Sequence, residues 1–211
     1  MDIILFGMQG SGKGTQAKRI AEALSLEIFE AGAALRKLSQ EDSELAQKVK
    51  SIMEAGNLVP TEVVMEIIQD FISKLPEGKS VLFDGIPRSN DQKEQLDEIM
   101  NSSGRNFTGI LIDITEQEAL RRLTTRKICT GCKAVYASFY DKEKCEACDG
   151  ELGTRKDDTP DAIRVRLDTF QAKTLPVIQD YEKEGKMIKV NGEQSIQEVN
   201  DAIMIVLKDN M

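Results

Sequence analysis

The sequence predicts an α/β fold with three layers, in which helices cover both faces of a five-stranded parallel sheet. Short apolar runs, which suit strands buried on both faces, alternate with longer amphipathic runs typical of helices. The 211 residues are enough for one such domain with insertions. A glycine-rich segment, GMQGSGKGT at residues 7–15, separates the first apolar run from the first helical run, as in a phosphate-binding P-loop.

Each element is expected from its own run of residues. The expected strands are residues 3–6, 27–29, 80–83, 109–114 and 187–190. The expected helices are residues 13–24, 33–38, 43–55, 61–74, 91–100, 116–127, 160–184 and 196–208. Pro60 and Pro160 suit helix starts. Two segments interrupt the alternation, which predicts a core of residues 1–29, 60–127 and 158–211 with insertions at 30–59 and 128–157.

Composition excludes several functional classes. The net charge of −8 argues against a general nucleic-acid-binding protein. No stretch is long and apolar enough to span a membrane, so no membrane partner is expected. The N-terminus enters a core strand without the basic-then-apolar pattern of a secretion signal, which predicts a cytoplasmic protein. The absence of histidine excludes histidine acid–base catalysis and histidine metal ligands.

The glycine-rich loop is the first candidate site. Glycines let the backbone turn tightly, so that successive N–H groups face one anion, and the following helix adds partial positive charge. Lys13 supplies a full charge to the outer phosphates of a nucleoside triphosphate. Gly14 stands where a serine or threonine usually follows the lysine, and Thr15 comes one residue later. The expected triphosphate-binding residues are Gly10, Ser11, Gly12, Lys13, Gly14 and Thr15.

The segment DGIPR, residues 84–88, follows the third expected strand and is the second candidate site. A carboxylate at the C-terminal end of a strand lies in the crevice where α/β sheets bind ligands, so Asp84 is expected to hold Mg²⁺ through water. Gly85 permits close backbone approach, and the guanidinium of Arg88 can bind a phosphate through two N–H groups.

All four cysteines form two Cys-x-x-Cys pairs, Cys129 with Cys132 and Cys145 with Cys148. Such pairs place four thiolates tetrahedrally around one Zn²⁺, and a closed shell of four cysteines indicates a structural metal. Iron also suits four thiolates. Two disulfides are the alternative, which a cytoplasmic location disfavours.

The GxxGxGKGT loop and the DGIPR segment resemble the motifs of nucleoside monophosphate kinases, above all the adenylate kinases, whose second motif reads DGFPR. The resemblance covers essentially the whole chain. It implies reversible, Mg²⁺-dependent phosphoryl transfer from ATP to AMP, giving two ADP, by a monomer. It also implies that residues 30–59 bind the monophosphate and that residues 128–157 form a zinc-bearing lid, both closing over the core to exclude water.

The resemblance further implies which side chains act on the nucleotides. The implied catalytic residues, which gather around the transferred phosphoryl group, are Lys13, Arg88, Arg122, Arg126, Arg155 and Arg166. The implied ATP site adds Val135, Tyr136 and the backbone of Gln194, and Arg122 stacks on the adenine. By contrast, Arg105, Arg121 and Arg164 are expected to be solvated surface groups.

The implied AMP site departs from the family pattern. The family's Thr-Gly-Asp is replaced by Ala31-Gly32-Ala33, whereas Arg36 is retained for the acceptor phosphate. An alanine at position 31 also resembles UMP/CMP kinases, but Gln92 matches the glutamine that reads adenine. The remaining implied AMP-site residues are Asn57, Leu58, Val59, Gly85, Ile86, Pro87, Arg88, Arg155 and Arg166. We expect AMP as the acceptor, with a UMP/CMP-type kinase and a catalytically weak nucleotide-binding regulator as alternatives.

Overall fold

The structure is a computed structural model that describes residues 1–136, 140–155 and 158–210, with the backbone alone for residues 209 and 210. Residues 137–139, 156 and 157, all within the predicted lid, lie outside the described residues. The predicted end of the lid, at residue 157, therefore lies outside them as well.

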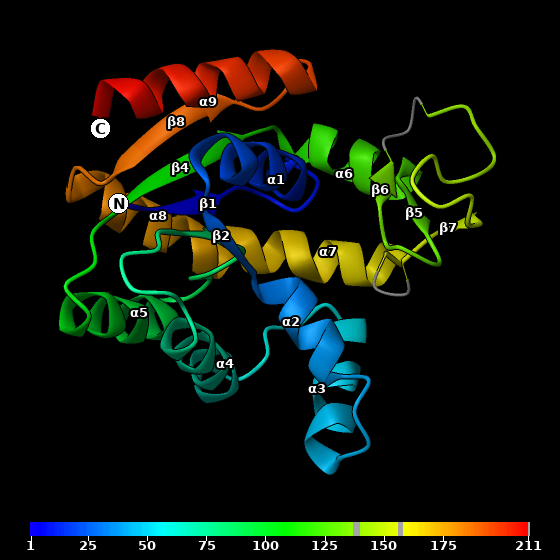
Figure 1. Ribbon diagram of the computed structural model, residues 1–211. Coiled ribbons are helices and arrows are strands. Elements are labelled where there is room, and N and C mark those ends of the chain that lie inside the picture. The colour runs from blue at the N-terminus through cyan, green and yellow to red at the C-terminus, as the bar shows by residue number, and fades with distance from the viewer. Residues whose placement is uncertain (137–139, 156–157, 211) are drawn as a thin grey trace.

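A five-stranded parallel sheet forms the centre of the molecule, as predicted (Figure 1). Its strands are β1 (Asp2–Phe6), β2 (Glu27–Glu30), β3 (Val81–Asp84), β4 (Phe107–Asp113) and β8 (Met187–Asn191), in the spatial order β2-β3-β1-β4-β8. β1 pairs directly with β3, so the glycine-rich loop after β1 and the DGIPR segment after β3 leave the same edge side by side. The sheet thereby joins two motifs that are far apart in the sequence.

Helices cover both faces of the sheet. They are α1 (Lys13–Leu24), α2 (Ala31–Leu38), α3 (Glu44–Glu54), α4 (Thr61–Ser73), α5 (Asn90–Ser102), α6 (Glu116–Thr125), α7 (Pro160–Thr169), α8 (Leu175–Lys183) and α9 (Ile196–Asn210). α1 and α9 lie on one face, whereas α4, α5, α7 and α8 lie on the other (Figure 1). Along β1, Ile3 and Leu5 are buried toward the first face and Ile4 and Phe6 toward the second, which is why the strand is apolar throughout.

Capping distinguishes α1 from several other helices. α3, α5, α6 and α7 begin after Ser43, Ser89, Thr115 and Thr159, whose hydroxyls accept a backbone N–H of the first turn. α1 instead begins after Gly12, which has a φ of 95° and makes no side-chain cap. The N-terminus of α1 therefore keeps N–H groups for an anion from outside the helix.

The prediction of one helix over residues 160–184 is wrong, because a π-helical turn, η1 (Phe170–Thr174), separates α7 from α8. Pro176 has no N–H to donate into the preceding turn, which accounts for the wider turn just before it. The turn brings the hydroxyl of Thr174 within 3.0 Å of the Arg88 carbonyl oxygen, to which it donates.

The prediction of a helix over residues 116–127 is wrong at its end. α6 stops at Thr125, and the chain enters a small antiparallel sheet of β5 (Lys127–Cys129), β6 (Val135–Tyr136) and β7 (Leu152–Gly153), in the order β6-β5-β7. Pairing of β5 with both neighbours overrides the helical pattern of Lys127. This small sheet lies at one end of the molecule, beyond α6 and α7 (Figure 1).

The prediction that Arg105 is a solvated surface group is also wrong. Its side chain is 18% exposed and donates to both carboxylate oxygens of Asp2, at 2.6 and 2.8 Å, and to the carbonyl oxygen of Lys79. Asp2 is almost fully buried and also accepts the N–H of Val81. Arg105 therefore neutralises a buried carboxylate at the N-terminal edge of the sheet. No helix in the described part of the chain has the length and apolarity needed to cross a bilayer.

Candidate nucleotide site and metal centre

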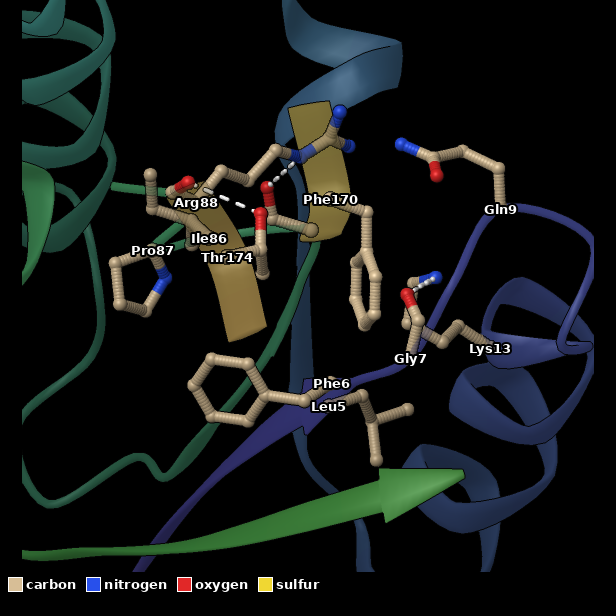
Figure 2. A pocket seen from close by; sticks show the side chains of 11 residues that line it. Leu5, Phe6, Gly7, Gln9, Lys13, Ile86, Pro87, Arg88, Phe170 and Thr174 are labelled. Atoms are coloured by element: carbon tan, nitrogen blue, oxygen red, sulfur yellow. Dashed lines mark hydrogen bonds between the residues drawn. The ribbon is translucent and has the colours of Figure 1, made fainter. Parts of the chain in front are cut away.

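The two motifs predicted to bind phosphate face one pocket at the C-terminal ends of β1 and β3 (Figure 2). Lys13 enters the pocket from the glycine-rich loop and Arg88 from the DGIPR segment, while Phe170 and Thr174 of η1 line it as well. A concave site with two convergent cations at the carboxyl ends of parallel strands is suited to a phosphorylated ligand.

The glycine-rich loop curves around the ammonium group of Lys13. Its Nζ donates to the carbonyl oxygens of Gly7, at 2.6 Å, and Met8, at 3.1 Å. A Cβ on Gly7 would lie 2.5 Å from Ser11 Oγ and 2.6 Å from the Ile112 carbonyl oxygen, so only glycine fits there. The Ser11 side chain is buried against this point, which leaves its backbone as the part available to a ligand.

Burial and neighbouring charges shift the pKa values of the cations in this pocket. Withdrawal of the Lys13 ammonium group from water lowers its pKa to about 8; the Asp84 carboxylate opposes this shift, and Arg88, Arg166 and Arg126 add to it. Burial, with smaller contributions from Arg166 and Arg36, likewise lowers the pKa of Arg88. These cations repel one another, and a polyanion bound between them would relieve the repulsion. The pocket is therefore electrostatically suited to a polyanion.

Arg88 is held in place by its own segment. Its Nε donates to the Gly85 carbonyl oxygen at 2.7 Å, and its backbone N–H donates to Gln92 Oε1 at 2.8 Å. Gly85 has a φ of 82°, and a Cβ there would lie 2.7 Å from Arg88 Nη2. Ile86 and Pro87 are buried beside it, so the backbone turn fixes where the guanidinium lies.

Asp158, which the sequence did not single out, holds two of the predicted arginines. Arg126 donates to both of its carboxylate oxygens, at 2.5 and 2.6 Å, and Arg166 donates to one at 3.0 Å. The Asp158 side chain is only 3% exposed. A buried carboxylate that pairs with two arginines positions both of them, and an acidic residue in this context offers little sequence signal beyond the nearby arginines.

The predicted adenine-stacking residue lies between two loops. Arg122 donates from Nη2 to the Gly192 carbonyl oxygen at 3.0 Å, and its Nε pairs with Glu118 at 2.6 Å. Gln194 is exposed in the same turn before α9. The structure therefore places Arg122 next to the segment predicted to contact the ATP base.

Arg36, which is predicted to bind the acceptor phosphate, lies on α2, where its guanidinium is near Gly32.

Two carboxylates flank Gly14. Glu30 and Asp84 are register partners at the ends of β2 and β3, and a Cβ on Gly14 would lie 3.6 Å from both Asp84 Oδ2 and Glu30 Oε1. Carboxylate oxygens are the ligands that Mg²⁺ and its bound waters prefer. The sequence identified Asp84 but missed Glu30, whose only signal is its position at a strand end.

The predicted acceptor-site residues on the helical insertion lie outside this pocket's lining. Ala31 and Val59 are buried in the hydrophobic core, at 4% and 5% exposure, while Asn57 is exposed and Leu58 is half-buried. Gln92 is 3% exposed and its Oε1 is engaged by the Arg88 backbone.

The four cysteines form one cluster, whose sulfur atoms all lie within 4.8 Å of one another. Each pair makes the same backbone turn: the N–H of Lys133 donates to the Cys129 carbonyl oxygen, and that of Asp149 to the Cys145 carbonyl oxygen. Lys133 and Asp149 both have positive φ angles, of 63° and 53°. Two equivalent turns therefore present four sulfurs to one point.

The cluster fits a metal ion. Thiolates ~2.3 Å from a tetrahedral Zn²⁺ lie about 3.8 Å apart, which matches the compactness of this cluster. The closest sulfur pairs, Cys129 with Cys148 and Cys132 with Cys145, are 3.4 Å apart, too far for disulfides. The four cysteines could thus hold a metal through a closed set of sulfur ligands.

Tyr136, which is predicted to line the ATP site, also contacts the cysteine cluster. Its hydroxyl lies 3.0 Å from Cys145 Sγ and accepts the N–H of Glu146. This contact lowers the pKa of the Cys145 thiol and so favours the thiolate that binds metals. Its neighbour Val135 is exposed on β6, and Arg155 is half-buried after β7. All three predicted lid residues therefore lie on or beside the small sheet.

Comparison with known proteins agrees with these features. The adenylate kinase family model matches residues 5–186. An adenylate kinase of Methanocella arvoryzae is 37% identical, over 99% of each chain. Adenylate kinases of Dehalococcoides mccartyi and Staphylococcus aureus are 36% and 35% identical, each over 98% of this chain and at least 98% of its own. The family match over residues 5–186 and the similarity over nearly the whole length of each relative lead to one conclusion: the chain belongs to the adenylate kinase family of phosphotransferases that act on nucleoside monophosphates.

Proposed function

We propose that the chain catalyses reversible phosphoryl transfer from ATP to AMP, giving two ADP, and thereby balances adenine nucleotides. The convergence of Lys13 and Arg88 on one pocket carries this proposal. Lys13 and the loop amides bind the donor phosphates, and Arg36 and Arg88 bind the acceptor phosphate. Arg122, Arg126, Arg155 and Arg166 surround the transferred group.

The reaction needs positioning rather than a general base. An AMP phosphate oxygen is already anionic at neutral pH and attacks Pγ, while the bond from Pγ to the bridging oxygen breaks and leaves ADP with the electron pair. The arginines neutralise the charge that spreads over the equatorial oxygens. Closure of residues 30–59 and 128–157 over the core would keep water from competing as the acceptor.

Two metals belong to the proposal. Asp84 and Glu30 would hold Mg²⁺, through water, beside Gly14, and the ion would supply positive charge that neutralises the phosphate oxygens. Cys129, Cys132, Cys145 and Cys148 would hold Zn²⁺ as a structural ion. The separated sulfurs also support a reducing, cytoplasmic compartment, and we propose that the protein acts there as a monomer.

Acceptor choice rests on few polar groups. Ala31 offers no hydroxyl to a base, whereas the Gln92 amide, whose oxygen is occupied by Arg88, keeps its Nε2 to donate. We propose AMP as the preferred acceptor, with weaker discrimination than a threonine at position 31 would give. Loss of one hydrogen bond to the base would weaken the selection of adenine by about fivefold.

The test is ADP formation from ATP and Mg²⁺ with AMP, UMP, CMP and GMP in parallel. Fast turnover with AMP is the expected result. Preference for UMP or CMP would overturn the assignment of Gln92 in favour of a pyrimidine nucleotide kinase. Binding of ATP without turnover of any acceptor would mark a regulator instead.

A further inference from the structure

Gln9 lies in the glycine-rich loop, where the motif itself requires no particular side chain. Its amide lines the pocket together with Lys13 and Arg88. In Figure 2 the amide nitrogen of Gln9 is turned toward the Arg88 guanidinium across the pocket, with Lys13 on the same side as Gln9. Three groups that donate hydrogen bonds thus face the space between the two motifs.

The oxygen of this amide is in an unusual position. Gln9 Oε1 is buried, yet within the described residues it has no hydrogen-bond partner. Buried polar atoms in folded proteins are nearly always paired, and an amide oxygen left without a donor destabilises the fold. An apolar side chain would cover the same loop without that penalty. The amide is therefore better explained by a bound ligand than by stability of the free protein.

The chemistry of the pocket identifies that ligand. Phosphoryl transfer involves little covalent chemistry by the protein, so hydrogen-bond donors around the moving group determine the rate. Gln9 Nε2 is an uncharged donor in the pocket that the two cations line, and Gln9 lies in the same loop as Lys13, four residues before it. The group that reaches this space from a triphosphate held by the loop is its terminal phosphate.

We propose that Gln9 is an additional substrate-contacting residue of this enzyme, whose Nε2 donates to the terminal phosphate of ATP and to the same group as it is transferred. With the ligand bound, the amide would turn over from its orientation in Figure 2, so that Gln9 Oε1 accepts an N–H from the guanidinium of Arg88 and ties the donor loop to the acceptor segment. This inference rests on the proposed function for the identity of the ligand, but its geometry is independent of which monophosphate accepts.

The test compares Gln9→Ala with Gln9→Glu, and uses Gln179→Ala, at an exposed position on α8, as the matched control. Loss of one donor to the transferred group is expected to lower kcat between about tenfold and a hundredfold in Gln9→Ala. Gln9→Glu keeps the shape but places a negative charge against the phosphate, so its loss is expected to be larger. Gln179→Ala should match the wild-type protein.

Two readouts separate this role from a structural one. Calorimetric titration should show weaker ATP binding by Gln9→Ala and unchanged ADP binding, because only ATP has the terminal phosphate on the donor side. The melting temperature should not fall, since the removed oxygen has no partner among the described residues. A wild-type kcat in Gln9→Ala, or equal losses of ATP and ADP affinity, would overturn the proposal. If the wild-type protein transfers to no monophosphate, the proposed function fails, and the ATP-to-ADP affinity ratio still decides the role of Gln9.

Discussion

The core and the small cysteine-bearing sheet are stabilised in different ways. In the central sheet, Ile4, Leu82 and Phe83 are fully buried between helices on both faces. Among the described residues of the segment 128–155, only Cys129 and Cys145 are buried. The core can therefore fold through apolar burial, whereas the segment around the cysteines is too small and too exposed to build its own core.

Under the proposed function, this difference suits the two regions to different tasks. The rigid sheet edge holds Lys13 and Arg88 in the pocket, and catalysis by positioning requires such rigidity. We expect that a segment whose four sulfurs hold a metal would move as one unit without disturbing the core.

The largest effect is expected from the pocket itself. Lys13→Ala and Arg88→Ala should each lower kcat by about a thousandfold or more, because each removes a charge aimed at the reacting phosphates. Circular dichroism and melting should remain close to wild type, since both side chains lie in a pocket rather than in the apolar core. Lys18→Ala, exposed on the same helix as Lys13, is the control. Near-normal turnover in either pocket variant would refute the assigned roles.

The next effect concerns stability. Phe83→Ala in β3 should lower the free energy of unfolding by about 3–5 kcal/mol, because it leaves a cavity in a fully packed core. Leu152→Ala in β7 is half-buried and should cost less than about 1 kcal/mol. Urea denaturation measures both. Equal losses would show that the two regions share one cooperative core.

Metal removal should separate the two regions directly. A chelator should expose the cysteine-bearing segment to proteolysis and lower activity, while the core keeps its own melting transition, because only the segment depends on the thiolate cluster. Thiol titration and limited proteolysis follow the segment, and calorimetry follows the core. Unchanged melting and unchanged activity after the metal is gone would contradict a structural role for the cluster.

The smallest effect is a pH dependence. Free Lys13 loses its proton near pH 8, and bound phosphates favour the charged form, so they raise its pKa. ATP binding at roughly pH 8–9 should therefore take up protons, and affinity should fall by at most about tenfold per pH unit as pH rises through this range. Calorimetry in buffers of different ionisation enthalpy measures the uptake. Lys13→Arg, which does not titrate there, should abolish it, and persistent uptake would assign the proton to another group.

The location of the candidate nucleotide site was predictable because its signals are local. The glycine-rich loop and the DGIPR segment each combine a strand end with a turn, and parallel pairing of β1 with β3 brings them together. Other features depend on distant partners. Asp158 acquires its role from Arg126 and Arg166, and Arg105 is buried because Asp2 lies opposite it. No local pattern distinguishes such residues from surface charges.

The alternation of strands and helices, the phosphate loop and the paired cysteines could be predicted without a structure, because each is encoded in spacing along the chain. The folded structure was needed to locate the end of α6, the π-helical turn beside Arg88, the register pairing of Glu30 with Asp84, and the amide oxygen of Gln9 that has no partner among the described residues. Most of these features depend on segments remote in sequence that meet only when the chain is folded, whereas the π-helical turn also reflects Pro176, which follows it directly.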